Sequence, residues 1–141
     1  NKFEKKDFLK FHPGGNLGKL LLTDIKKLMY CDYKLTHLKS SFEEVVNNLN
    51  YNGLGITFVV DNQIDNKVIG VITDGDLRRS LINGTMDVSA EVLMSKDYIT
   101  APHNMNYIEA NKILNKHKIN ALAVVDGNNS VIGIYKTNKL E

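Results

Sequence analysis

The stretch GVITDGDLRR, residues 70–79, holds the side chains of this sequence best suited to binding a polar ligand. A β-branched run ends at Thr73, and Asp74, Gly75 and Asp76 follow before two arginines. Where a strand passes into a helix, unpaired N–H groups and a partial positive charge favour an anionic group. The Asp76 carboxylate can also accept two hydrogen bonds side by side, as the vicinal hydroxyls of a ribose or another sugar would donate them.

The same residues have a purely structural interpretation. Thr73 and Asp76 have the spacing of a capping box variant, in which the acidic side chain also complements the helix dipole. Arg78 and Arg79 suit a ligand phosphate and solvated helix charges equally well. The spacing leaves both interpretations open, and both can hold together.

An internal repeat places this motif in a larger pattern. Residues 28–61 align with residues 93–126 at a constant offset of 65 residues, and VIGVI aligns with VIGIY after a short deletion. In the second copy Lys136 and Lys139 stand where the first has Thr73 and Asp76. We therefore expect one ligand-competent cleft and one degenerate cleft.

Each copy predicts the order strand, helix, strand, strand, helix. ITFVVD and ALAVVD are short apolar runs ending in turn residues, as buried strands do. Ser41 and Glu44 form a capping box at the start of the first helix, and the second helix is expected to begin after Asn104. Apolar side chains at helical spacing define the buried faces: Phe42, Val45, Val46 and Leu49, then Tyr107, Ala110, Ile113 and Leu114.

The predicted fold class is α/β, with two β-α-β-β-α units related by a pseudo-twofold axis. A unit of roughly 55 residues buries too little surface alone, so we expect the two to pack face to face with clefts between them. The predicted boundaries are residues 1–21 outside the repeat, 22–84 for the first copy and 85–141 for the second. Gly84 lies in the polar segment that joins them.

Composition narrows the classes of function. The net charge of +2 argues against nucleic acid and anionic membranes as partners, and the longest apolar run is far too short to span a bilayer. Cys31 has no internal disulfide partner and is expected to be buried or half-buried. We expect a cytoplasmic protein without a cofactor. No metal is expected, because three histidines lack metal-ligand spacing and are assigned to the surface or a cleft: His37, His103 and His117.

The G-h-x-T-x-x-D pattern at the last strand–helix junction of a duplicated unit resembles the CBS domains, named after cystathionine β-synthase. The resemblance covers residues 22–141 and implies a tandem pair, or Bateman module, a regulatory unit that often binds adenosyl ligands or other nucleotides. It implies that Thr73 and Asp76 contact phosphate and ribose. The expected ligand-binding set is Leu35, Thr36, Leu54, Gly55, Ile56, Thr73, Asp74, Asp76 and Arg79.

The segment HPGGNLGKLLLTDIKKLM, together with TDGDLRR, resembles arabinose-5-phosphate isomerases, where it joins a sugar isomerase (SIS) domain to a CBS pair. The resemblance implies that this chain is a C-terminal fragment, preceded in the parent by the SIS domain. It implies interconversion of ribulose 5-phosphate and arabinose 5-phosphate by the parent, on the way to Kdo for lipopolysaccharide or capsule. His12 is then a contributor to the parent's active site, although His12 to Gly15 also fits a simple turn.

The leading hypothesis is a regulatory module that binds a nucleotide or a nucleotide sugar such as CMP-Kdo. A purely structural dimerisation module without ligand is the alternative, and catalysis by the fragment itself is not expected. Homodimers are expected through residues 41–51 and 105–116, within a tetrameric parent. The C-terminal helix is expected to be truncated, and Leu140 and Glu141 are either native residues or a cloning remnant.

Overall fold

The structure, a computed structural model, describes residues 23–61 and 65–136. This part of the chain forms two three-stranded sheets. The first contains β1 (Thr36–His37), β2 (Ile56–Asp61) and β3 (Lys67–Thr73), and the second contains β4 (Thr100–Pro102), β5 (Ala121–Val125) and β6 (Val131–Lys136). In each sheet the first strand runs parallel to the middle strand and the third runs antiparallel to it.

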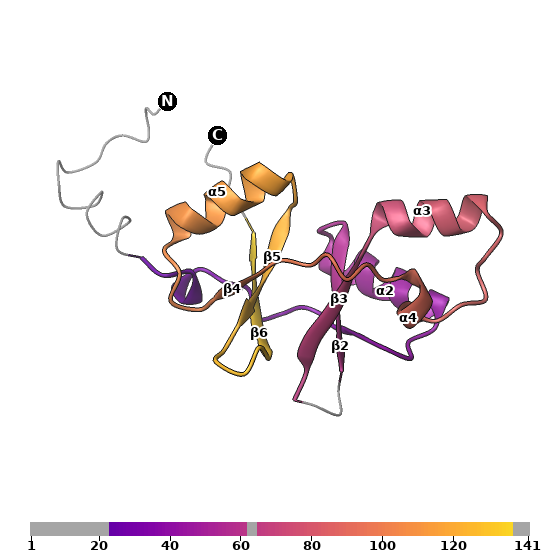
Figure 1. The fold of residues 1–141 in the computed structure, drawn as a ribbon, viewed down its shortest axis with the longest axis horizontal. Helices are drawn as coiled ribbons and strands as arrows, with labels where there is room; N and C mark the ends of the chain where they lie inside the picture. The colour runs from indigo at the N-terminus through magenta and orange to yellow at the C-terminus, as the bar shows by residue number, and fades with distance from the viewer. Residues whose placement is uncertain (1–22, 62–64, 137–141) are drawn as a thin grey trace.

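The helices follow the same repeat. Helix α2 (Phe42–Asn52) and helix α5 (Tyr107–His117) each connect the first strand of a sheet to its middle strand. Helix α3 (Asp74–Ile82) follows β3, as the sequence predicts, whereas the corresponding helix after β6 would fall outside the described residues. Figure 1 shows the two halves side by side, with α2 and α3 beside the first sheet and α5 beside the second.

Two short helices are exchanged between the halves. The 3-10 helix η2 (Ile25–Lys27) precedes β1 in the chain but packs on the second half, where Ile25 N–H donates to the Met105 carbonyl at 2.9 Å. Helix α4 (Ala90–Leu93) precedes β4 but packs on the first half, where Ala90 N–H donates to the Ser40 carbonyl at 2.8 Å. Figure 1 shows η2 beside β4 and α4 beside α2. The two sequence repeats are therefore interlocked in space.

The chain between each exchanged helix and its strand is also held by the opposite sheet. Tyr30 exchanges two backbone hydrogen bonds with Ile134 of β6, at 2.7 and 3.0 Å, and Ser95 does the same with Val71 of β3, at 2.9 and 2.8 Å. A glycine lies next to each bridge: a Cβ at Gly70 would collide with Met94, and one at Gly133 would collide with Met29. These glycines let the exchanged segments approach the strands closely.

The apolar core has three parts. Between the two sheets lies a cluster to which both repeats contribute, including Phe58 and Val71 from the first and Ala123 and Ile134 from the second. Behind each sheet, a second cluster buries the helix face together with one exchanged residue, Ile25 in one half and Ala90 in the other. Face-to-face packing of the halves, expected because neither unit is large enough alone, is confirmed by the shared central cluster.

Local predictions agree with the structure except at three places. The capping box at the start of α2 is confirmed, with both the Ser41 and the Glu44 side chains accepting from backbone N–H groups. Val46 was expected on the buried face but is 39% exposed, because it lies at the edge of the stripe that Val45 and Leu49 define. Helix α5 is capped by Asn106, two residues later than expected.

The third correction concerns Cys31. Its side chain is exposed rather than buried or half-buried. It lies in an irregular segment between the Tyr30 bridge and β1, where no regular element directs the side chain toward a core.

Candidate ligand-binding clefts

The first candidate cleft is built around the start of α3. Thr73 is the N-cap: its Oγ1 accepts from the Asp76 N–H at 3.3 Å, and Asp76 Oδ2 accepts from the Thr73 N–H at 2.9 Å. The capping interpretation of this motif is therefore confirmed. It fixes the position of the Asp76 carboxylate relative to the end of β3.

The helix cap does not use every acceptor position of the Asp76 carboxylate. The Thr73 hydroxyl donates to Oδ2 at 3.2 Å, and the Arg79 guanidinium donates to Oδ1. A carboxylate offers about four acceptor positions, so Oδ1 keeps one in reserve. The Arg79 side chain is 69% exposed, so its ion pair is the weak, screened kind that a ligand can displace.

Thr73 and Asp76 lie at the rim of a cavity of about 190 Å³ between the two halves. The other polar side chains that line it are Ser95 and Asp97, both from the second repeat. The remaining wall is apolar and comes from both sheets and the adjoining segments: Ile56, Phe58, Val71, Tyr98, Ile99, Ile119 and Ala121. We call this cavity cleft A; it combines an apolar floor with a polar rim.

Four residues of the segment before β4 line cleft A without having been predicted to do so: Ser95, Asp97, Tyr98 and Ile99. They enter because the Ser95 bridge to Val71 lays the chain before β4 against the end of β3. Leu35 and Thr36, which were expected to bind the ligand, do not line cleft A. Thr36 is fully buried, and its hydroxyl is hydrogen-bonded to Thr57 at 2.9 Å, which gives it a structural role. Leu35 packs against the central core cluster and borders a separate outer groove.

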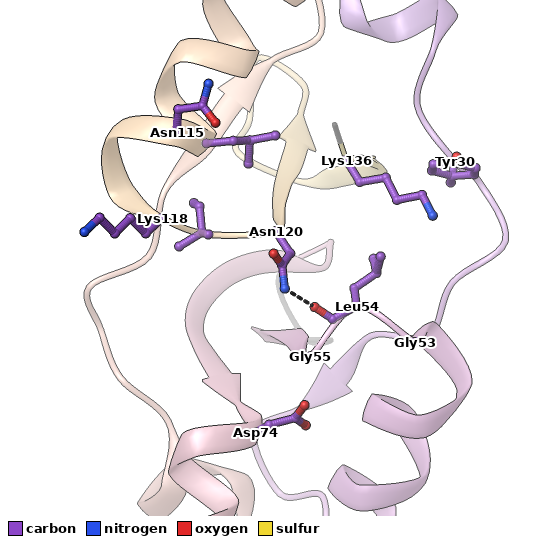
Figure 2. A pocket seen from close by; sticks show the side chains of 11 residues that line it. Tyr30, Gly53, Leu54, Gly55, Asp74, Asn115, Lys118, Asn120 and Lys136 are labelled. Atoms are coloured by element: carbon purple, nitrogen blue, oxygen red, sulfur yellow. Dashed lines mark hydrogen bonds between the residues drawn. The ribbon is translucent and has the colours of Figure 1, made fainter. Parts of the chain in front are cut away.

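A second and larger cavity, about 810 Å³, also has walls from both halves; we call it cleft B (Figure 2). Two equivalent loops face each other across it, residues 53–55 after α2 and residues 118–120 after α5, joined by a 3.2 Å hydrogen bond from the Asn120 amide to the Leu54 carbonyl. Its wall also includes Tyr30, Asp74, Leu114, Asn115 and Lys136.

The structure thus divides the residues that the sequence analysis grouped together. Ile56, Thr73 and Asp76 line cleft A, whereas Leu54, Gly55 and Asp74 line cleft B. Arg79 lines neither cavity but is held beside cleft A by Asp76. His12 and Lys139 lie outside the described residues, as do Leu140 and Glu141.

The two clefts differ in charge. The acidic and basic side chains that line cleft A are the carboxylates Asp76 and Asp97, whereas cleft B is lined by Lys118 and Lys136 along with Asp74. Lys136 is held with its Nζ 5.0 Å from the centre of the Tyr30 ring, within cation–π range. At the central core cluster, partial burial raises the pKa of the Tyr33 hydroxyl above 10.0, and the thiol charge of Cys31 adds to the effect.

The part of the chain that the structure describes has neither a metal-binding cluster nor a membrane-spanning helix. No group of three or more His, Cys, Asp or Glu side chains is arranged to hold a metal ion there. No helix of that part is long and apolar enough to cross a bilayer. His37 and His117 are exposed and His103 is partly buried.

The duplicated sheet-and-helix unit, with a Thr-x-x-Asp cap at the end of its third strand, defines a class of protein. The sequence matches the CBS domain family twice, over residues 23–83 and 88–136, and the chain belongs to that family. Its fold class is α/β, in the arrangement of a tandem CBS pair.

Among characterised sequences, the chain is similar to bacterial sugar-phosphate isomerases. It is 33% identical over 137 residues to arabinose 5-phosphate isomerase KpsF of Escherichia coli, covering 96% of this chain and 41% of that protein. It is 37% identical over 134 residues to arabinose 5-phosphate isomerase GutQ of Escherichia coli K12, covering 93% and 41%. The chain therefore spans about two fifths of the length of these relatives.

Solved structures share the fold. CBSX2 in complex with AMP superposes with a TM-score of 0.67 at 21% identity, covering 80% of this chain and 89% of that one. The CBS domain pair of protein MJ0100, in complex with 5′-methylthioadenosine and S-adenosyl-L-methionine, superposes with a TM-score of 0.69 at 23% identity, covering 82% and 90%. At these identities the likeness concerns the fold.

Proposed function

We propose that this CBS pair is a regulatory module that binds a nucleotide or nucleotide sugar in cleft A. One observation carries the proposal: the Asp76 carboxylate lies at the rim of an apolar cavity and keeps a free acceptor position there. A flat heterocycle suits the slot, and a ribose diol suits Asp76 at the rim. At about 190 Å³ the slot is smaller than the roughly 300 Å³ at which drug-sized sites begin, so it fits a base rather than a whole nucleotide.

The contacts around Asp76 suggest how a nucleotide would be received. Oδ2 stays engaged in the cap, while Oδ1 exchanges the exposed Arg79 for a ribose hydroxyl. Arg79 is then released at the mouth of the cleft, where a guanidinium binds phosphate well. Adenosyl and adenine nucleotide ligands in CBSX2 and MJ0100 support this chemistry for the fold.

The relatives support a proposal for the parent protein. We infer that the chain is the CBS portion of an arabinose-5-phosphate isomerase in which a SIS domain carries out the isomerisation. In that setting the CBS pair is not itself catalytic, and CMP-Kdo is a reasonable feedback ligand because it is a nucleotide sugar derived from the reaction product. His12 would belong to the isomerase side of the junction.

The second candidate function, dimerisation, is favoured by exposed apolar side chains on one half. Large apolar side chains on α3, α4 and the segment between them are more than half exposed: Leu81, Ile82, Met86 and Val92. We expected contacts through residues 41–51 and 105–116, but among described residues α5 contributes none of the exposed large apolar side chains. The proposed dimer surface is therefore the outer face of the first half, to which Val46 also belongs.

Calorimetric titration of the chain with AMP, ATP, CMP and CMP-Kdo tests the ligand proposal. We expect one ribosyl ligand to bind per chain. Phe58→Ala and Asp76→Ala should each lower the affinity for that ligand. Absence of binding by all four, combined with a dimer in light scattering, would favour the purely structural alternative.

A further inference from the structure

Two lysines in the wall of cleft B stand where the first repeat has uncharged residues. Lys136 ends β6 at the position that Thr73 occupies at the end of β3, since Lys136 pairs with Ala121 as Thr73 pairs with Ile56. Lys118 occupies the position of Gly53 at the end of the preceding helix. Of the two, Lys136 brings positive charge to the cavity itself, because Lys118 points away from it (Figure 2).

Lys118 is kept at a conformational cost. Its φ of 54° is left-handed, where Gly53 has φ 66° in the first repeat. Such a backbone suits glycine and strains a lysine. The left-handed turn at Lys118 ends α5 and positions the loop at residues 118–120 that lines cleft B.

Lys136 is the better placed of the two cations. The ring of Tyr30 holds its Nζ at 5.0 Å from the ring centre, so the ammonium group is oriented before any ligand arrives. Within the described residues Lys136 forms no ion pair with a carboxylate. Figure 2 shows it directed toward Tyr30, on the side of the cavity away from Asp74, with Lys118 pointing outward beyond the opposite wall.

The remaining wall of cleft B suits hydroxyl groups rather than a base. Asn115 and Asn120 bring side-chain amides, which both donate and accept hydrogen bonds, and the loop at residues 53–55 adds backbone groups. The cavity is open and polar, and it lacks the apolar lining that Phe58 and Val71 give to cleft A.

We propose that cleft B is a separate binding site for a phosphate ester of a small polyhydroxylated molecule, with the phosphate on Lys136 beside Tyr30 and the hydroxyls toward Asn115 and Asn120. Lysine binds phosphate as a point charge, without the planar geometry that a guanidinium demands. A phosphate there could come from a free sugar phosphate or from the tail of a nucleotide seated in cleft A, because Ile119 lines both cavities. The site is independent of the nucleotide proposal, so either can fail alone.

The test is titration of the full chain with glucose 6-phosphate and with inorganic phosphate, followed by amide chemical shifts and calorimetry, with and without saturating AMP. We expect glucose 6-phosphate to bind more tightly than phosphate, to perturb residues 118–120 and 136, and to bind equally well when AMP is present. Lys136→Thr restores the residue of the first repeat and should lower the affinity for glucose 6-phosphate roughly tenfold to a hundredfold. The matched control, Lys112→Gln, removes an exposed lysine of α5 that does not line the cavity and should have no effect.

Three results would overturn the proposal. Glucose 6-phosphate that fails to bind the folded wild-type chain excludes the site, as does binding that Lys136→Thr and Lys112→Gln weaken equally. If AMP competes with glucose 6-phosphate and Lys136→Thr weakens AMP as well, Lys136 serves the nucleotide of cleft A and no separate site exists. Thermal unfolding of each variant shows whether a loss of binding follows from loss of the fold.

Discussion

Replacing Asp76 with alanine separates its two roles in a measurable way. The substitution removes the acceptor for the Thr73 N–H, at 2.9 Å, and a first-turn negative charge, while leaving the Thr73 hydroxyl to cap the Asp76 N–H. Capping interactions contribute about 0.5–2 kcal/mol and first-turn charges about 0.3–1 kcal/mol. Because the Arg79 partner is largely exposed, we assign its ion pair no further stability. We expect a loss of about 1–2 kcal/mol in unfolding free energy.

Glu44→Ala is the matched control. Glu44 has the same position in the capping box of α2, where its carboxylate accepts from the Ser41 N–H at 2.8 Å, and it does not line cleft A. Both variants should lower the melting temperature by roughly 3–8 °C, measured by circular dichroism. Only Asp76→Ala should also lower the affinity for AMP, by roughly ten- to a hundredfold in calorimetry, since a hydrogen bond to a charged group contributes about 1.5–3 kcal/mol.

The intermediate variant sharpens the test. Asp76→Asn keeps an acceptor for the Thr73 N–H but removes the charge, so its losses in both stability and AMP affinity should be smaller than those of Asp76→Ala. If Asp76→Ala resembles Glu44→Ala in stability and binds AMP with wild-type affinity, Asp76 is only a capping residue. The assignment of cleft A as the nucleotide site would then be refuted.

Three further predictions follow from other parts of the fold. Gly133→Ala should destabilise the chain by about 1–3 kcal/mol in urea unfolding, because the new Cβ collides with Met29. Gly127→Ala, with no atom near the new Cβ, should be close to neutral, and equal effects of the two substitutions would contradict the close-approach argument. Hydrogen bonds from the backbone N–H groups of residues 130 and 128 lower the pKa of Asp126 below 3.8. The contribution of Asp126 to stability is therefore present above that pH and is lost as the pH falls through the folded-state pKa. Asp126→Asn should abolish this part of the pH dependence of unfolding. Ile82→Asp should convert the proposed dimer to a monomer in light scattering, and an unchanged mass would place the contact elsewhere.

Much of the fold was predictable because its signals are local. The capping boxes join residues three positions apart, so their spacing alone predicts where α2 and α3 begin. Short apolar runs between turn residues predicted β2, β3, β5 and β6, and the repeat predicted two halves with a shared core. The residues missed locally, Val46 and Cys31, lie at the edge of a helical stripe and in an irregular segment, where periodicity carries little information.

The sites were predicted only in part. Thr73 and Asp76 were identified from their own motif, and Lys136 was recognised as the departure in the second copy. Residues 95–99 were missed, and Leu35 and Thr36 were grouped with a cleft that they do not line. No spacing within the chain reveals which half a segment will pack against.

The sequence by itself determined the elements, their order and the chemistry available at the end of each third strand. Only the tertiary structure decided that η2 and α4 exchange halves, that Ser95 lies against Val71, and that Thr73 and Lys136 line different cavities. The physical reason is the range of the interactions: a cap depends on neighbours along the chain, whereas the exchange depends on Met29 and Met94 fitting over glycines of the opposite sheet. That fit between surfaces is set only when the two halves meet.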